Sequence, residues 1–163
     1  MPRDEIHVSG APPAWRVKAA ATRLVIAARS LGLVRAPAGL TLSVSCVGAA
    51  AMKRLNRRYR AKNRPTDVLS FENRGPAPRG IAFLGDLVLC LDVTRRQARA
   101  EGHGVRDEAV VLLAHGLLHL LGFDHERSAR EDARMAAAEE KLLRASRLLK
   151  TPAGLIVRSK VRK

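Results

Sequence analysis

The chain has 163 residues, 47% of them hydrophobic, and its 30 Lys and Arg against 15 Asp and Glu give a formal net charge of +15. This length suffices for one domain with an adequate core, and the positive charge favours a polyanionic partner, most simply nucleic acid. No stretch reaches the roughly 18 apolar residues of a membrane span and residues 1–8 lack the apolar run of a signal peptide, so we expect a cytoplasmic protein with no membrane partner.

Hydrophobic periodicity predicts strands and helices that alternate along the chain. In chain order the expected elements are a strand at residues 5–8, a helix at 14–31, a strand at 41–47, a helix at 49–59, strands at 66–71 and 83–93, and helices at 94–100, at 105–121 and after 128.

These elements predict an α/β (α+β) fold, a single compact domain with a small mixed sheet covered by about five helices. We expect a metal site on a buried helix and the loop after it, for the reasons given below. Ser128 and Glu131 form a capping-box pair that marks the start of the last helix. We expect the domain to cover residues 1–149 and a loose basic tail to cover 150–163.

Three histidines with the spacing H-x3-H-x5-H form the most informative motif. His115 and His119 are four residues apart, so on a helix both imidazoles project from one face, about one turn apart. Gly122 tolerates the left-handed conformation that ends helices and would bring His125 back toward the same point. Three neutral imidazoles leave one open position on a tetrahedral Zn²⁺, which is typical of a catalytic site.

The alternative is that these histidines are ordinary core residues, as a lone histidine on an apolar helix usually is. The predicted helix is apolar almost all round, so two adjacent buried imidazoles would leave nitrogens unpaired at a cost on the order of 1–3 kcal/mol each. A shared ion removes that cost. We therefore interpret His115, His119 and His125 as ligands of one Zn²⁺ per chain.

Gly116 separates this motif from the zinc-protease signature H-E-x-x-H-x-x-G-x-x-H, which has its general-base glutamate at that position. Peptidase chemistry by the usual route is therefore not expected. A glycine within a helix costs roughly 1 kcal/mol relative to alanine, so it has a packing or functional reason. We hypothesise that the missing carboxylate suits an anionic substrate, because no negative charge then opposes a phosphate near the ion.

Basic residues are concentrated in two blocks that contain no acid. Residues 53–64 carry seven of them, and the chain after Glu140 carries eight. These runs are either solvated faces inflated by an arginine-rich composition or contacts for phosphates. Since compositional bias does not explain the absence of acids, we favour phosphate contacts.

The histidine motif follows residues 55–60 (LNRRYR), 65–71 (PTDVLSF) and 84–86 (LGD), and this series resembles the bacterial YbeY family of rRNA maturation factors over roughly residues 40–145. The resemblance implies a zinc-dependent endoribonuclease with a metal site at the three histidines and a functional arginine at Arg60. It also implies rRNA end processing and ribosome quality control, with rRNA and the small ribosomal subunit or its associated proteins as partners. We expect a monomer.

A mechanistic hypothesis follows, with Arg60 and His115 as catalytic residues. Bound Zn²⁺ would polarise a phosphodiester oxygen and acidify water, and Arg60 would clamp the phosphate and stabilise developing charge; otherwise Arg60 forms a surface salt bridge. Asp67, Asp86 and Asp124 either orient the histidines or cap turns.

Two further functional classes remain open. One is a zinc hydrolase of a substrate other than RNA, and the other is a non-catalytic, metal-stabilised ribosome assembly or RNA-binding factor. Tyr59 and Phe71 could stack on a base, but because aromatics make up only 3% of the chain, we expect both to pack in the core.

Overall fold

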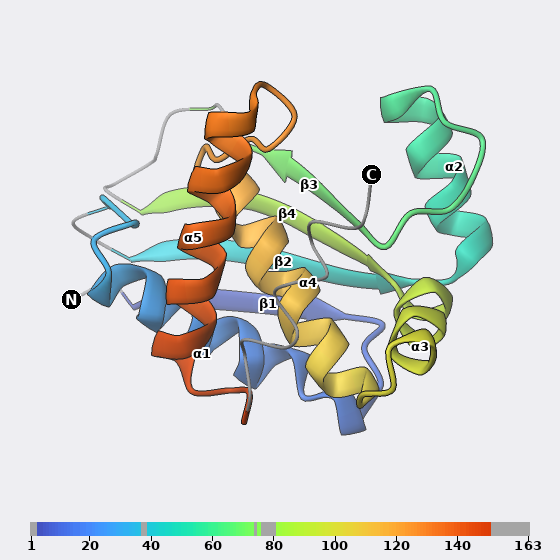
Figure 1. Cartoon of the computed structure of the whole chain (residues 1–163), viewed down its shortest axis with the longest axis horizontal. Helices are drawn as coiled ribbons and strands as arrows, with labels where there is room; N and C mark the ends of the chain where they lie inside the picture. The colour runs from blue at the N-terminus through green and yellow to red at the C-terminus, as the bar shows by residue number, and fades with distance from the viewer. Residues whose placement is uncertain (1–2, 37–38, 74, 76–80, 151–163) are drawn as a thin grey trace.

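The computed structural model (Figure 1) describes residues 3–36, 39–73, 75 and 81–150. Every strand and helix expected from the sequence is present among them. In chain order the elements are β1 (Glu5–Ser9), the 3-10 helix η1 (Pro13–Trp15), α1 (Val17–Ser30), β2 (Leu40–Val47), α2 (Ala49–Arg60), β3 (Val68–Glu72), β4 (Ala82–Cys90), α3 (Leu91–Ala100), α4 (Val105–Leu120) and α5 (Ala129–Ser146).

The four described strands form one mixed sheet in the order β1-β2-β4-β3. β1, β2 and β4 are parallel, and β3 pairs antiparallel with β4 at an edge. Gly85 lies in β4 with φ +142°, next to a register irregularity opposite Thr41 and Leu42, and a Cβ there would collide with the carbonyl oxygen of Phe71. Only glycine fits this close approach of two strands, which explains its place in the LGD segment.

Alternate residues of β4 build cores on the two faces of the sheet. Leu87 and Leu89 belong to the main core, which includes residues of α1, α4 and α5. Val88 and Cys90 face the other way and pack with Met52 of α2 in a second, smaller core, here called the α2 core. Figure 1 shows α4 crossing the middle of the sheet with α1 and α5 on one side of it, and α2 set apart at the far end of the strands. The period-2 alternation of a strand therefore separates the layer that carries the histidines from the α2 layer.

Two expected boundaries were wrong. The strand expected to run to residue 93 ends at Cys90, and Val93 is buried on a helix that already includes Leu91. The helix expected from residue 14 is interrupted at Arg16, which has φ 51° between η1 and α1. An apolar run shows that a segment is buried but not whether it is strand or helix, so these boundaries needed tertiary contacts.

The ends of the two helices that flank the histidine loop follow the local prediction. Gly122 has φ +96°, and its N–H donates to the carbonyl of His119 at 3.0 Å directly after α4. Ser128 Oγ accepts from the Glu131 N–H at 3.1 Å and caps α5. These local bonds set the short loop that carries His125.

Each helix in the described part of the chain is too short or too polar to span a bilayer. The proposed tail beyond Lys150 and most of the Gly- and Pro-rich segment at 74–80 lie outside the described residues.

Candidate metal centre

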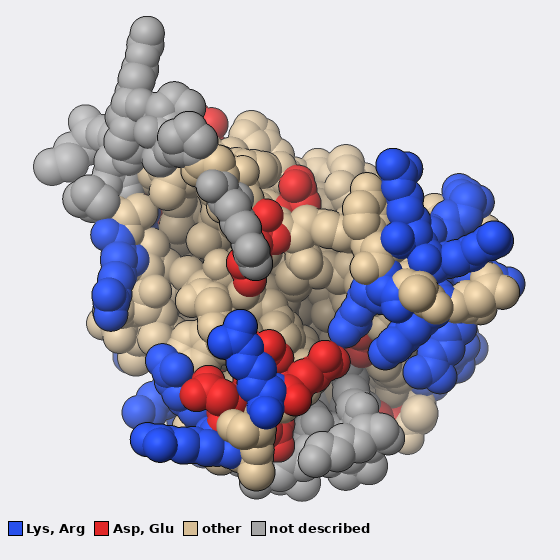
Figure 2. Space-filling model, turned by 90° about the horizontal axis from the view of Figure 1, so that it is seen from above, with Lys and Arg blue, Asp and Glu red and all other residues tan. Residues whose placement is uncertain are grey.

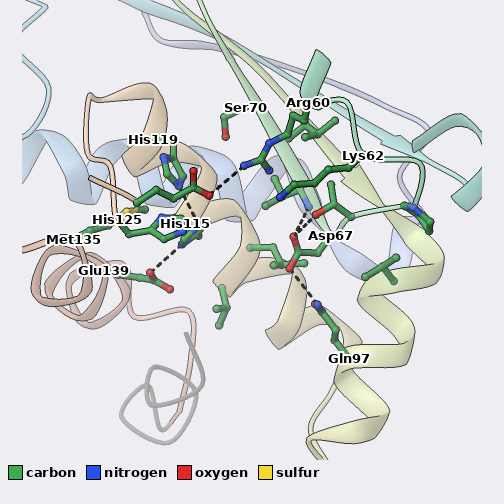
Figure 3. A pocket seen from close by; sticks show the side chains of 18 of the residues that line it. Arg60, Lys62, Asp67, Ser70, Gln97, His115, His119, His125, Met135 and Glu139 are labelled. Carbon is green, nitrogen blue, oxygen red and sulfur yellow. Dashed lines mark hydrogen bonds and ion pairs between the residues drawn. The ribbon is translucent and has the colours of Figure 1, made fainter. Parts of the chain in front are cut away.

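The three histidines of the motif meet at the C-terminal end of α4 (Figure 3). Nε2 of His115 and Nε2 of His119 are 3.2 Å apart, and one ring nitrogen from each of the three residues lies within 4.8 Å of the others. A tetrahedral zinc ion with bonds of about 2.0–2.1 Å holds its nitrogens roughly 3.3–3.4 Å apart. Small side-chain adjustments are therefore enough for His115, His119 and His125 to share one ion.

The polar atoms of the cluster also fit a cation. His125 Nδ1 is buried and has no hydrogen-bond partner among the described residues. Burial, together with the neighbouring His115 and His125, lowers the pKa of His119 to about 4. This imidazole is therefore neutral at pH 7 and keeps a lone pair for a ligand bond. A divalent ion would satisfy nitrogens that the protein leaves facing one another.

Glu139 of α5 is a site residue that the sequence analysis missed. Its Oε2 lies 3.3 Å from Nδ1 of His115, and its side chain is only 2% exposed. A carboxylate that accepts from Nδ1–H fixes the tautomer and leaves Nε2 as the ligand atom, toward His119. The available signal was a glutamate on the buried stripe of α5 that includes Met135 and Leu142.

We expect Glu139→Gln to weaken divalent metal binding by about 10- to 100-fold, because the amide keeps the shape but loses the charge that holds the His115 tautomer. Competition with a chromogenic chelator measures this affinity. The control is Glu140→Gln, whose carboxylate pairs with Arg144 on the surface. Equal affinities in the two variants would contradict the role of Glu139.

Arg60, the last residue of α2, points across the pocket toward the histidine loop (Figure 3). Its Nη2 lies 3.4 Å from Oε1 of Glu126, the residue after His125. The two side chains are 40% and 63% exposed, so this ion pair is weak. The salt-bridge alternative is thus present in the structure. It also holds the guanidinium one residue from a histidine of the cluster, where a phosphate can replace the carboxylate.

The LNRRYR segment places Arg60 through a buried asparagine. Asn56 is 1% exposed, and its Nδ2 donates to the carbonyl of Arg64 at 2.7 Å. Ala61 has φ 56° and ends α2, while Leu55 packs against the α2 core. The end of the helix and the following loop are therefore tied together below Arg60.

Two of the three aspartates singled out from the sequence accept backbone hydrogen bonds at turns, and Asp124 is also near enough to His119 for their charges to interact. Asp67 accepts from the N–H of Val68 at 2.8 Å, where β3 starts. Asp124 accepts from the N–H of Glu126 at 2.9 Å, which lowers the pKa of its carboxyl and shapes the loop that carries His125. Strand alternation places Asp86 on the α2 face of β4, across the sheet from α4. Turn formation therefore describes Asp67 and Asp124 better than orientation of the histidines.

Gly116 lies where α4 packs closely against β3 and β4. A Cβ at this position would lie 2.8 Å from Cδ2 of Leu87 and 3.3 Å from Ser70 Oγ and Val68 Cγ2. Packing therefore gives a reason for the glycine, and the same contacts leave no room for the glutamate of the protease motif. The idea that a missing carboxylate suits an anionic substrate remains a hypothesis.

We expect Gly116→Ala to destabilise the protein by about 1–3 kcal/mol, because overpacking against Leu87 outweighs the roughly 1 kcal/mol gained in helix propensity. Urea denaturation measures the change in the free energy of unfolding. In a Leu87→Val background, which lacks the clashing methyl, the penalty should shrink. A Gly116→Ala variant more stable than the parent would show that this approach is not tight.

The three histidines line a cavity of about 1270 Å³. Its other walls are formed by side chains from α2, β3, α4 and α5. This volume exceeds the roughly 300–1,000 Å³ of small-molecule pockets and suits part of a polymer. Figure 2 shows Lys and Arg side chains gathered at one end of the molecule beside a hollow, and Asp and Glu side chains nearer the centre of the molecule. The exposed basic residues of this α2 block are Lys53, Arg54, Arg57, Arg58, Arg60, Lys62 and Arg64.

Comparison with known proteins gives one consistent family. The model of the family described as Endoribonuclease YbeY matches residues 16–147. An Endoribonuclease YbeY of Myxococcus xanthus is 51% identical over 108 residues, which are 64% of this chain and 36% of that protein. One of Anaeromyxobacter sp. is 43% identical over 144 residues, which are 88% of this chain and 73% of that protein. The chain thus spans about a third of the first relative and most of the second.

A solved structure shares the fold. The solution structure of TM1509 from Thermotoga maritima aligns with a TM-score of 0.54 at 23% identity, over 87% of this chain and 91% of that one.

Proposed function

The chain belongs to the endoribonuclease YbeY family, and from that premise we propose that it hydrolyses phosphodiester bonds of single-stranded RNA. The observation that carries the proposal is the position of Arg60 and the three-histidine cluster on one open cavity. We propose zinc as the ion, one per chain, because three imidazoles with one open position are a usual catalytic zinc set.

Each residue has a distinct part in the proposed reaction. His115, His119 and His125 hold the ion, and Glu139 keeps His115 in the required tautomer. When bound, the ion supplies a Lewis acid for the phosphate and acidifies water. Arg60 exchanges its weak contact with Glu126 for two phosphate oxygens, and its planar donors stabilise charge that develops on them.

We further propose the cellular setting. The substrate would be rRNA, with cleavage in small-subunit rRNA end processing and ribosome quality control. The partners would be rRNA and the small ribosomal subunit or its associated proteins, in the cytoplasm, with the chain acting as a monomer. Residues 1–149 would form the catalytic domain, since the family match lies within them, and 150–163 would add phosphate contacts.

The test is to incubate the purified full chain with an rRNA precursor, with and without a chelator, beside His115→Ala. We expect cleavage by the parent, none with chelator or with the variant, and recovery when Zn²⁺ is returned to the chelated parent. RNA that is bound but never cut would favour the assembly factor. A chain that neither binds nor cuts RNA would favour a hydrolase of another substrate.

A further inference from the structure

Tyr59 is an exposed aromatic side chain on the wall of the cavity. Its exposed fraction is 56%, and among the described residues the other exposed large hydrophobic side chains are Ile26 and Leu31. Of these three, Tyr59 alone lines the cavity. The expectation that Tyr59 packs in the core was therefore wrong, whereas Phe71 is partly buried against the α2 core. An aromatic ring that is open to solvent inside a pocket points to a ligand.

The ring of Tyr59 is also held in place. Its centroid lies 4.9 Å from that of Phe71 in an edge-on arrangement with an interplanar angle of 70°. The guanidinium carbon of Arg58 lies 5.4 Å from the Tyr59 centroid, over the ring. Arg58 is itself exposed, so its side chain can move aside and leave the ring face that it covers to another flat group. An aromatic ring and an arginine guanidinium are the two flat side-chain groups on which proteins commonly stack nucleic-acid bases, and both are present here.

The place of Tyr59 in the chain couples it to the candidate reaction site. Arg60 is the next residue, and its guanidinium contacts Glu126 beside His125. The Asn56 side chain fixes the loop after both of them. Toward the N-terminus of α2, the exposed side chains of Lys53, Arg54 and Arg57 lie outside the cavity lining. Figure 2 shows Lys and Arg gathered at one end of the molecule. Positive charge for the backbone and an aromatic ring for a base therefore lie on one helix.

We propose that Tyr59 is a stacking platform for an RNA base next to the phosphate that Arg60 contacts, with the exposed arginines of α2 along the flanking backbone. This inference rests on the proposed RNA-cleaving function. It also gives the site a basis for selecting single strands, because a base inside a duplex is stacked on both sides and cannot lie on Tyr59.

The test uses the full chain with its metal and a short single-stranded RNA that carries 2-aminopurine at one position at a time. Fluorescence is read on mixing, before the strand is cut. We expect quenching at one position by the parent and by Tyr59→Phe, and loss of that quenching in Tyr59→Leu. The affinity of Tyr59→Leu for the RNA should fall by roughly 5- to 150-fold, the range for one base–aromatic stack.

An abasic site at the quenched position supplies the matched control on the RNA, because it should abolish the difference between parent and Tyr59→Leu. On the protein, Ile26→Ala removes a similarly exposed apolar side chain outside the cavity and should change nothing. Equal affinities of parent and Tyr59→Leu, or equal losses on intact and abasic RNA, would overturn this inference while cleavage by the parent kept the proposed function. A parent that neither binds nor cuts RNA would overturn both.

Discussion

Replacing His119 with alanine is expected to empty the metal centre and to lower RNA cleavage by about 10³-fold or more, with the fold retained. Its Nε2 lies 3.2 Å from that of His115, so its loss leaves two imidazoles for an ion that needs three. Burial is the largest of the causes that lower the pKa of His119 to about 4. Protons therefore do not compete with the metal ion for this imidazole near pH 7. The loss of several kcal/mol of Lewis-acid stabilisation sets the size of the rate effect.

Elemental analysis of protein purified without chelator measures this result. The parent should carry about one divalent ion per chain, and His119→Ala should carry little. His7→Ala is the matched control, since His7 lies on β1 with 63% of its side chain exposed. Full occupancy in a His115→Ala, His119→Ala double variant would remove the basis for the site.

Replacing Arg60 with lysine is expected to lower the cleavage rate by roughly 10²-fold or more while RNA affinity and metal content change little. Lysine keeps the positive charge but loses the planar fork that binds two phosphate oxygens together. If Arg60 stabilises the transition state, the loss appears in kcat at nearly constant KM, on the scale of one preorganised donor.

Single-turnover cleavage and equilibrium binding on the same RNA separate the two roles. Arg57→Lys is the control, because Arg57 is an exposed residue of the same basic helix and α2 ends only at Arg60. Parallel losses of binding and cleavage in Arg60→Lys, or no loss in either, would reduce Arg60 to a general electrostatic contact.

The elements were predictable wherever the determining interactions are local. The 3.6-residue pattern of α4, the left-handed Gly122 after it and the cap of Ser128 on Glu131 each involve residues only a few positions apart. The convergence of His115, His119 and His125 belongs to this class, because one helical turn and one tight loop bring them together. Helix geometry and a single glycine were enough to specify it.

Sequence by itself therefore determined the element order, the histidine cluster and the basic α2 block, whereas tertiary packing decided what surrounds them. Glu139 reaches His115 from 24 positions along the chain, and Gly116 is required by side chains of two strands. Tyr59 is exposed because α2 ends at the rim of the cavity. Such contacts depend on how helices lie against the sheet, and local periodicity reports only that a residue is buried, not which distant residue it meets.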